Sequence, residues 1–122
     1  MTNILVIDDE LQVREILQQM LERKGYSVCL AENGVEAMET CKNQNLDLVI
    51  VDMVMPEKNG LETIKELKRD YPSIKIIAIS GGHMIGPKRY LDNAKTFGAD
   101  RFFEKPFSSG EILGAVEELV GV

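Results

Sequence analysis

Five polar side chains follow, or lie just beyond, short apolar runs of this sequence. They are Asp8, Asp9, Asp52, Ser80 and Lys105. Together they suit the handling of a phosphoryl group, because a carboxylate can attack phosphorus while an ammonium and a hydroxyl stabilise the phosphoryl oxygens. Three carboxylates that gather in one place need compensation, either from a divalent cation or from a nearby ammonium such as that of Lys105. Hard oxygen ligands favour Mg²⁺ over zinc, which is more often bound by His or Cys.

Short β-branched or aromatic runs alternate with segments of helical periodicity. The predicted strands are residues 4–7, 27–31, 48–51, 74–79 and 101–103. The predicted helices carry apolar residues at intervals of three and four over 13–21, 35–41, 61–67, 90–97 and 112–120. Strict alternation predicts an α/β fold, in which helices cover both faces of a parallel sheet.

All five polar positions fall at the carboxyl ends of predicted strands. Sites in open α/β sheets form outside this edge, where the strand order reverses. If the strand order is 2-1-3-4-5, the first and third strands are neighbours about 4.8 Å apart. The three aspartates would then converge, and Ser80 and Lys105 would join the same rim. Each residue alone has an ordinary interpretation, such as a helix cap for Asp8 or Asp9. Their coincidence on one rim favours a functional site.

Length, composition and charge narrow the class of protein. The chain has 122 residues, 44% of them hydrophobic, and a formal charge of -6. These values predict one ordinary globular domain and argue against non-specific binding to nucleic acid or anionic membranes. We expect Cys29 and Cys41 to be small apolar side chains in a reducing compartment. No signal peptide or membrane span is predicted, so a cytoplasmic location is expected.

Four motifs in order resemble those of a response-regulator receiver domain, the phosphoryl-accepting module of bacterial two-component signalling. They cover residues 4–10, 46–56 with Gly60, 79–81 and 98–107. The resemblance extends over essentially the whole chain. It implies a flavodoxin-like, doubly wound (βα)5 fold with a five-stranded parallel sheet in the order 2-1-3-4-5. It also implies one receiver domain over residues 1–122, either stand-alone or cut from a longer regulator.

The resemblance assigns a role to each acidic residue. Asp52 is implied to be the nucleophile that takes a phosphoryl group from a sensor histidine kinase or a histidine phosphotransfer protein. Asp9 and Asp52 would ligate Mg²⁺ directly, and Asp8 would do so through water. The main-chain carbonyl of Val54 would complete the protein ligands. The domain would catalyse its own phosphorylation and dephosphorylation without being a conventional turnover enzyme.

The remaining motif residues are implied to read the phosphorylated state. Ser80 would hydrogen-bond one phosphoryl oxygen and Lys105 would pair with another, with Lys105-Pro106 resembling the family's cis peptide. Phe102 would turn inward behind Ser80 and change the face formed by the fourth helix, fifth strand and fifth helix. Phe102 departs from the tyrosine often found there, and the segment after Ser80 is longer than usual. A place for His83 beside the phosphoryl group is a hypothesis, weighed against a solvent-exposed loop histidine.

Three other functions compete with phosphoryl signalling as interpretations of these residues. A dehalogenase-type phosphatase would need Asp-x-Asp after the first strand, where this chain has Asp8-Asp9-Glu10. A flavin or nucleotide binder would need a glycine- or hydroxyl-rich phosphate loop there, and the acidic pair repels phosphate. A degenerate receiver that only binds partners stays the alternative. The effector is unknown, neither nucleic acid nor membrane is an expected partner, and a homodimer formed on phosphorylation stays open.

Overall fold

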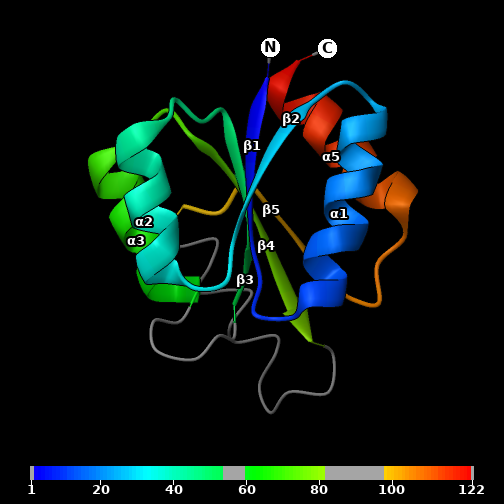
Figure 1. Cartoon of the computed structure of the whole chain (residues 1–122), viewed down its shortest axis with the longest axis horizontal. Helices are drawn as coiled ribbons and strands as arrows, with labels where there is room; N and C mark the ends of the chain where they lie inside the picture. The colour runs from blue at the N-terminus through cyan, green and yellow to red at the C-terminus, as the bar shows by residue number, and fades with distance from the viewer. Residues whose placement is uncertain (1, 54–59, 82–97, 122) are drawn as a thin grey trace.

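The computed structural model describes residues 2–53, 60–81 and 98–121, in which strands and helices alternate along the chain (Figure 1). The strands are β1 (Asn3–Ile7), β2 (Ser27–Ala31), β3 (Leu48–Asp52), β4 (Lys75–Gly81) and β5 (Arg101–Lys105). The helices are α1 (Leu11–Arg23), α2 (Gly34–Asn43), α3 (Gly60–Asp70) and α5 (Ser109–Val120). The helix predicted over residues 90–97 lies outside the described residues.

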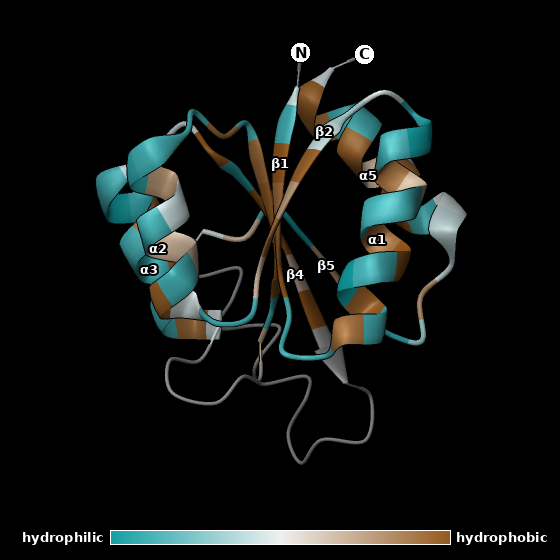
Figure 2. Ribbon diagram, in the orientation of Figure 1, coloured by the Kyte–Doolittle hydropathy of each residue, from teal (hydrophilic) through white to brown (hydrophobic). Residues whose placement is uncertain are grey.

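All five strands run parallel in the order β2-β1-β3-β4-β5, which confirms the predicted fold. Helices α2 and α3 cover one face of the sheet, and α1 and α5 cover the other (Figure 1). The hydropathy colouring of Figure 2 shows apolar strands in the centre and polar outer surfaces on the helices. None of the helices in the described part of the chain has the length and apolar character that a membrane span requires.

Alternate residues of the central strands feed two separate cores. Leu5 and Ile7 of β1 belong to the core beneath α2 and α3, whereas Ile4 and Val6 belong to the core beneath α1 and α5. Every residue of β3 is buried as well. This two-sided burial is the reason that these strands read as almost continuous apolar runs.

Three strands, β3, β4 and β5, end slightly later than the sequence predicts, whereas β1 and β2 end as predicted. Asp52 is the last residue of β3 and is paired with Ile79, rather than following the strand. The β4 strand continues to Gly81, which is paired with Lys105 at the end of β5. The predicted ends were too early because hydrogen bonding to a neighbouring strand continues a ladder beyond the last apolar side chain. The polar residues still lie at the carboxyl edge, as predicted.

Two helix starts follow ordinary capping rules. The Asn33 side chain accepts a hydrogen bond from the Glu36 main-chain N–H at 2.8 Å at the start of α2. Ser108 and Glu111 form a reciprocal capping box at the start of α5. At α1 the N-cap residue is Glu10, with no side-chain cap. The interpretation of Asp8 or Asp9 as the N-cap of this helix is therefore wrong.

Gly60 allows the start of α3 to approach the end of β3. Its main-chain N–H donates to the carbonyl of Met53 at 3.1 Å. A Cβ atom at this position would overlap the carbonyl oxygen of Asp52 and lie 2.6 Å from the Met53 Cα atom. The backbone that presents Asp52 thus depends on a residue without a side chain.

We predict that Gly60→Ala lowers the free energy of unfolding by about 1–3 kcal/mol, because the new methyl group has no space beside the end of β3. The matched control is Gly114→Ala in the middle of α5, where a Cβ atom would meet nothing within 4 Å. That variant should gain about 0.5–1 kcal/mol from helix propensity. Urea unfolding measures both. Equal shifts of the same sign would contradict the close approach at Gly60.

Candidate functional site

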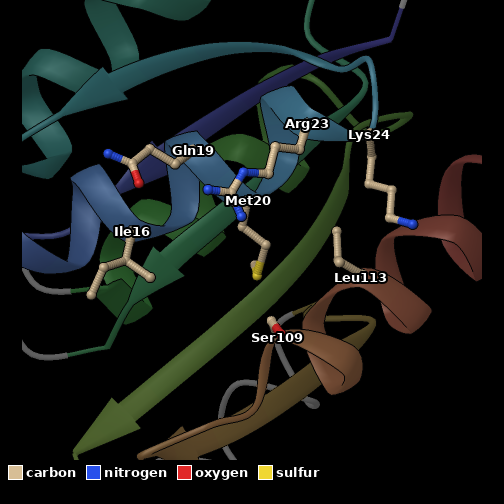
Figure 3. A pocket seen from close by; sticks show the side chains of 7 residues that line it. All are labelled: Ile16, Gln19, Met20, Arg23, Lys24, Ser109 and Leu113. Carbon is tan, nitrogen blue, oxygen red and sulfur yellow. The ribbon is translucent and has the colours of Figure 1, made fainter.

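A groove between α1 and α5 has a volume of about 390 Å³ (Figure 3). Its lining residues are Ile16, Gln19, Met20, Arg23, Lys24, Ser109 and Leu113. The lining contains two cationic side chains and no carboxylate, so it does not suit a cation or the attack on phosphorus. The chemistry expected from the sequence is found instead at the carboxyl edge of the sheet.

Asp8 is held tightly at the point where β1 ends. Its main-chain N–H donates to the carbonyl of Ala31 at 3.1 Å, which continues the pairing with β2. Its Oδ1 atom accepts a hydrogen bond from the Glu10 main-chain N–H at 2.9 Å. Only 1% of the Asp8 surface is exposed. The carboxylate is therefore fixed inside the edge rather than free to turn to solvent.

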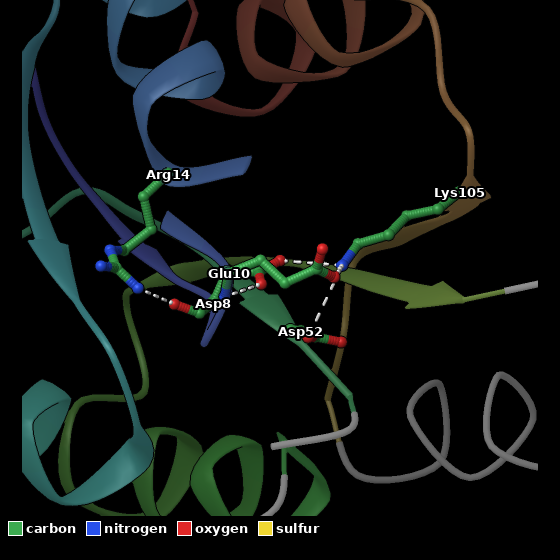
Figure 4. A network of polar contacts seen from close by, with 5 residues as sticks. All are labelled: Asp8, Glu10, Arg14, Asp52 and Lys105. Carbon is green, nitrogen blue, oxygen red and sulfur yellow. Dashed lines mark hydrogen bonds and ion pairs between the residues drawn. The ribbon is translucent and has the colours of Figure 1, made fainter. Parts of the chain in front are cut away.

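Lys105 connects the ends of three strands (Figure 4). Its Nζ atom lies 3.0 Å from Asp8 Oδ2, 3.3 Å from Glu10 Oε1 and 3.6 Å from Asp52 Oδ2. Asp52 is only 4% exposed. The Lys105 side chain reaches from the end of β5 across to the ends of β1 and β3. An ammonium and two buried carboxylates therefore meet as the strand order predicts.

Negative charge exceeds positive charge in this cluster. One ligand oxygen each from Asp8, Asp9 and Glu10 lies within 4.8 Å of the others, and Asp52 adds a fourth carboxylate through its contact with Lys105. Asp9 and Glu10 are exposed, unlike Asp8 and Asp52. One ammonium does not balance four carboxylates. The cluster is therefore a favourable place for a further cation.

Burial acts on both partners of the closest ion pair. It raises the pKa of Asp8 above its usual range, against the opposing effects of the Glu10 N–H and the Lys105 ammonium. For Lys105, burial alone would lower the pKa, but Asp8, Asp52 and Glu10 together raise it. Lys105 is therefore charged at neutral pH, and the burial of Asp8 favours additional positive charge beside its carboxylate.

The donors present suit magnesium. Asp8 Oδ2 is buried and has no well-directed hydrogen bond among the described residues, although the Lys105 ammonium lies close to it. The nearby carboxylates of Asp9 and Glu10 supply hard oxygen donors that reach solvent. No His or Cys belongs to this group in the described part of the chain. Such a set fits Mg²⁺ better than Zn²⁺.

The other predicted site residues are placed only in part. Ser80 lies within β4, with its Cα paired to Glu104 of β5, so its backbone stands at the expected edge. Its hydroxyl, Val54 and His83 lie outside what the structure describes. The roles predicted for them stay predictions.

The remaining two predictions concern β5 and the turn that follows it. Phe102 is half-buried and packs against the core beneath α2 and α3. Its proposed inward turn stays a prediction. The Lys105-Pro106 peptide bond is cis, which confirms that part of the family resemblance.

Two residues at this edge were missed by the sequence analysis as members of the site. Glu10 contacts Lys105, although it could have been noticed as the third acid of an acidic run. Arg14 is buried, and its Nη1 atom donates to the carbonyl of Asp8 at 2.8 Å. The sequence pattern that could have revealed Arg14 is its spacing of three and seven residues from Leu17 and Leu21, which puts a charged residue on the buried side of α1.

Sequence comparisons place these observations beside known proteins. A family model described as the response regulator receiver domain matches residues 4–117. The response regulator SaeR of Staphylococcus aureus (strain USA300) is 34% identical over 120 residues, which make up 98% of this chain and 51% of SaeR. The chain thus spans about half the length of the curated relatives that it matches.

Solved structures are similar over nearly the whole chain. Response regulator TrrA of Thermotoga maritima, in complex with Mg²⁺-BeF, has a TM-score of 0.85 and 35% identity, covering 98% of this chain and 99% of that one. Chemotaxis protein CheY4 of Vibrio cholerae has a TM-score of 0.87 and 26% identity, with 98% of each chain covered. NtrX of Brucella abortus has a TM-score of 0.90 and 27% identity, over 98% of this chain and 27% of NtrX.

The raised pKa of Asp8 predicts a pH dependence of stability without metal. As pH rises through the folded-state pKa of Asp8, the folded wild type must release a proton that the unfolded chain has already lost. The wild type should therefore lose stability relative to Asp8→Asn by about 1.4 kcal/mol for each unit by which folding raises this pKa. Urea unfolding in EDTA between about pH 4 and about pH 8 measures the difference.

The matched control for this titration is Asp70→Asn. Asp70 is exposed on α3, and its hydrogen bond with Arg69 lowers its pKa. The wild type should therefore gain stability relative to this variant only as pH rises toward the ordinary value near 3.8, so the difference should stay nearly constant between about pH 4 and about pH 8. A difference between wild type and Asp8→Asn that does not change with pH would contradict the account of Asp8.

Proposed function

Because this chain belongs to the response regulator receiver domain family of two-component signalling, we propose that it accepts a phosphoryl group on Asp52. The donor is the phosphohistidine of a sensor histidine kinase or of a histidine phosphotransfer protein. The observation that carries the proposal is the Asp52 carboxylate, nearly buried at the end of β3 and 3.6 Å from the Lys105 ammonium. Residues 1–122 act as one receiver domain in this proposal.

The proposed metal is Mg²⁺, held directly by Asp9 and Asp52 and through water by Asp8. The main-chain carbonyl of Val54 completes the protein ligands in this proposal. Support comes from the clustered carboxylate oxygens of residues 8–10 and from TrrA, which was solved with Mg²⁺-BeF. When bound, Mg²⁺ neutralises carboxylate and phosphoryl oxygens and so favours the approach of two negative groups.

The proposed transfer makes one bond and breaks one bond. An Asp52 carboxylate oxygen forms a bond to phosphorus as the phosphorus–nitrogen bond to the histidine breaks, and the electron pair of that bond remains on the imidazole nitrogen. Lys105 pairs with a phosphoryl oxygen, and the Ser80 hydroxyl donates to another. The raised pKa of Lys105 keeps its ammonium charged for this task at neutral pH. Hydrolysis of the resulting acyl phosphate restores Asp52.

The proposed output is a change in the surface around β5. Ser80 moves toward the phosphoryl group and Phe102 turns inward behind it, which alters the face that the fourth helix, β5 and α5 present to an effector. The half-buried position of Phe102 against the core leaves it between two environments. In this proposal the protein acts in the cytoplasm, with a downstream protein or a second copy as its partner. Neither nucleic acid nor membrane is a direct partner.

The alternative of a receiver that only binds partners, without phosphorylation, is not favoured. Such a domain is expected to have lost the acceptor aspartate or the lysine. Here Asp52 and Lys105 are both present and lie in contact. Nothing in this geometry supports a second function more strongly.

We predict that incubation with Mg²⁺ and acetyl phosphate adds the mass of one phosphoryl group to the intact protein. Asp52→Asn should abolish the gain, because the amide nitrogen and oxygen are poor nucleophiles compared with a carboxylate. Asp70→Asn, which changes an exposed aspartate at the end of α3, should keep it. Intact-mass spectrometry measures the mass of the wild type and of both variants. A wild type that gains nothing, or an Asp52→Asn variant that still gains it, would overturn the proposed function.

A further inference from the structure

Arg14 is the buried cation that the proposed transfer does not use. It is 8% exposed, and it is the only buried Lys or Arg among the described residues. It lies on the opposite side of Asp8 from Lys105, so that the two cations flank the acidic turn after β1 (Figure 4). A buried guanidinium is costly unless its donors are used. The contacts of the Arg14 guanidinium therefore indicate its structural role.

The Arg14 side chain holds the backbone just before Asp9, and its main chain makes the first helical hydrogen bond of α1. Its guanidinium donates through Nη1 to the carbonyl of Asp8 at 2.8 Å. Its main-chain N–H donates to the carbonyl of Glu10 at 3.2 Å. The guanidinium thus ties the peptide unit before Asp9, and the peptide unit after Asp9 is held by the Glu10 N–H, which donates to Asp8 Oδ1 at 2.9 Å. The direction of the Asp9 side chain follows from the orientation of these two peptide units.

The guanidinium has an anchor of its own beyond the turn. Its Nη2 atom lies 3.7 Å from Glu32 Oε1, just after β2. A planar guanidinium can contact a carbonyl through one nitrogen and a carboxylate through the other. A lysine ammonium has a single nitrogen and cannot make both contacts in this geometry. The hydrogen bond to the Asp8 carbonyl directs the guanidinium, and the ion pair with the largely exposed Glu32 supports that direction.

We propose that Arg14 is a positioning residue for the divalent cation, acting through the backbone of residues 8–10 to hold the Asp9 carboxylate in its ligating direction. The proposal deepens the proposed function, on which it rests for the identity of the cation. Its consequence is specific. Loss of Arg14 weakens cation binding even though it removes a positive charge from the neighbourhood.

Electrostatics and positioning predict opposite signs for one substitution. By charge alone, Arg14→Met makes the cluster more negative and should strengthen Mg²⁺ binding. By positioning, both Arg14→Met and Arg14→Lys should weaken it, by about tenfold, as outer-layer changes at metal sites commonly do. Isothermal titration calorimetry with Mg²⁺ alone measures the dissociation constant. The control Arg23→Met removes an exposed charge from the same helix and should leave affinity within about twofold.

Phosphorylation by acetyl phosphate gives the second readout. At limiting Mg²⁺ both Arg14 variants should be slower than wild type, and saturating Mg²⁺ should restore the wild-type rate, because Asp52 and Lys105 are untouched. Circular dichroism checks the fold, and Arg14→Lys carries the test if Arg14→Met does not fold. Unchanged or tighter Mg²⁺ binding by the folded variants would overturn the inference. A wild type that binds Mg²⁺ but is never phosphorylated would instead overturn only the proposed function.

Discussion

Negative charge collected at the carboxyl edge of the sheet, and its compensation by Lys105, is the constraint on which the rest of this structure depends. Two carboxylates are buried there, Asp8 and Asp52, and neither could be placed at such a position without a cation in reach. Lys105 supplies that charge from the end of β5, at 3.0 Å from one and 3.6 Å from the other. The excess of carboxylates that remains is what makes the edge attractive to a divalent ion.

The sheet is what brings these charges together. Because β1 and β3 are buried on both faces, their apolar residues leave only the strand ends for polar side chains. The order β2-β1-β3-β4-β5 then makes the ends of β1 and β3 neighbours. Gly60 lets α3 begin directly against the end of β3, which keeps the backbone at Asp52 in place. Fold and charge are thus linked through a few positions at one edge.

Apolar periodicity was sufficient to predict the strands, the described helices and the carboxyl-edge position of Asp8, Asp52 and Lys105. It could not predict their partners, because a side-chain contact depends on register and reach rather than on local pattern. The contact between Glu10 and Lys105 joins residues 95 positions apart. The burial of Arg14 could not be predicted for a similar reason. A charged residue on an apolar helix face is recognised as buried only when its hydrogen-bond acceptor is known. The ends of β3, β4 and β5 were predicted early because hydrogen-bonded ladders continue past the last apolar side chain.

Lys105 and Arg14 have different roles on the two sides of the acidic turn formed by residues 8–10. Lys105 balances charge and, in the proposed function, pairs with the phosphoryl group. Arg14 holds the main chain on the other side, and in the proposed role it keeps the Asp9 carboxylate aimed at the metal. Both roles require that carboxylates from the ends of β1 and β3 share one divalent ion. A crystal soaked in Mn²⁺ tests it, through the anomalous difference map. One peak ligated by both Asp9 and Asp52 is the predicted result, whereas a peak held by Asp9 and Glu10 without Asp52 would contradict it.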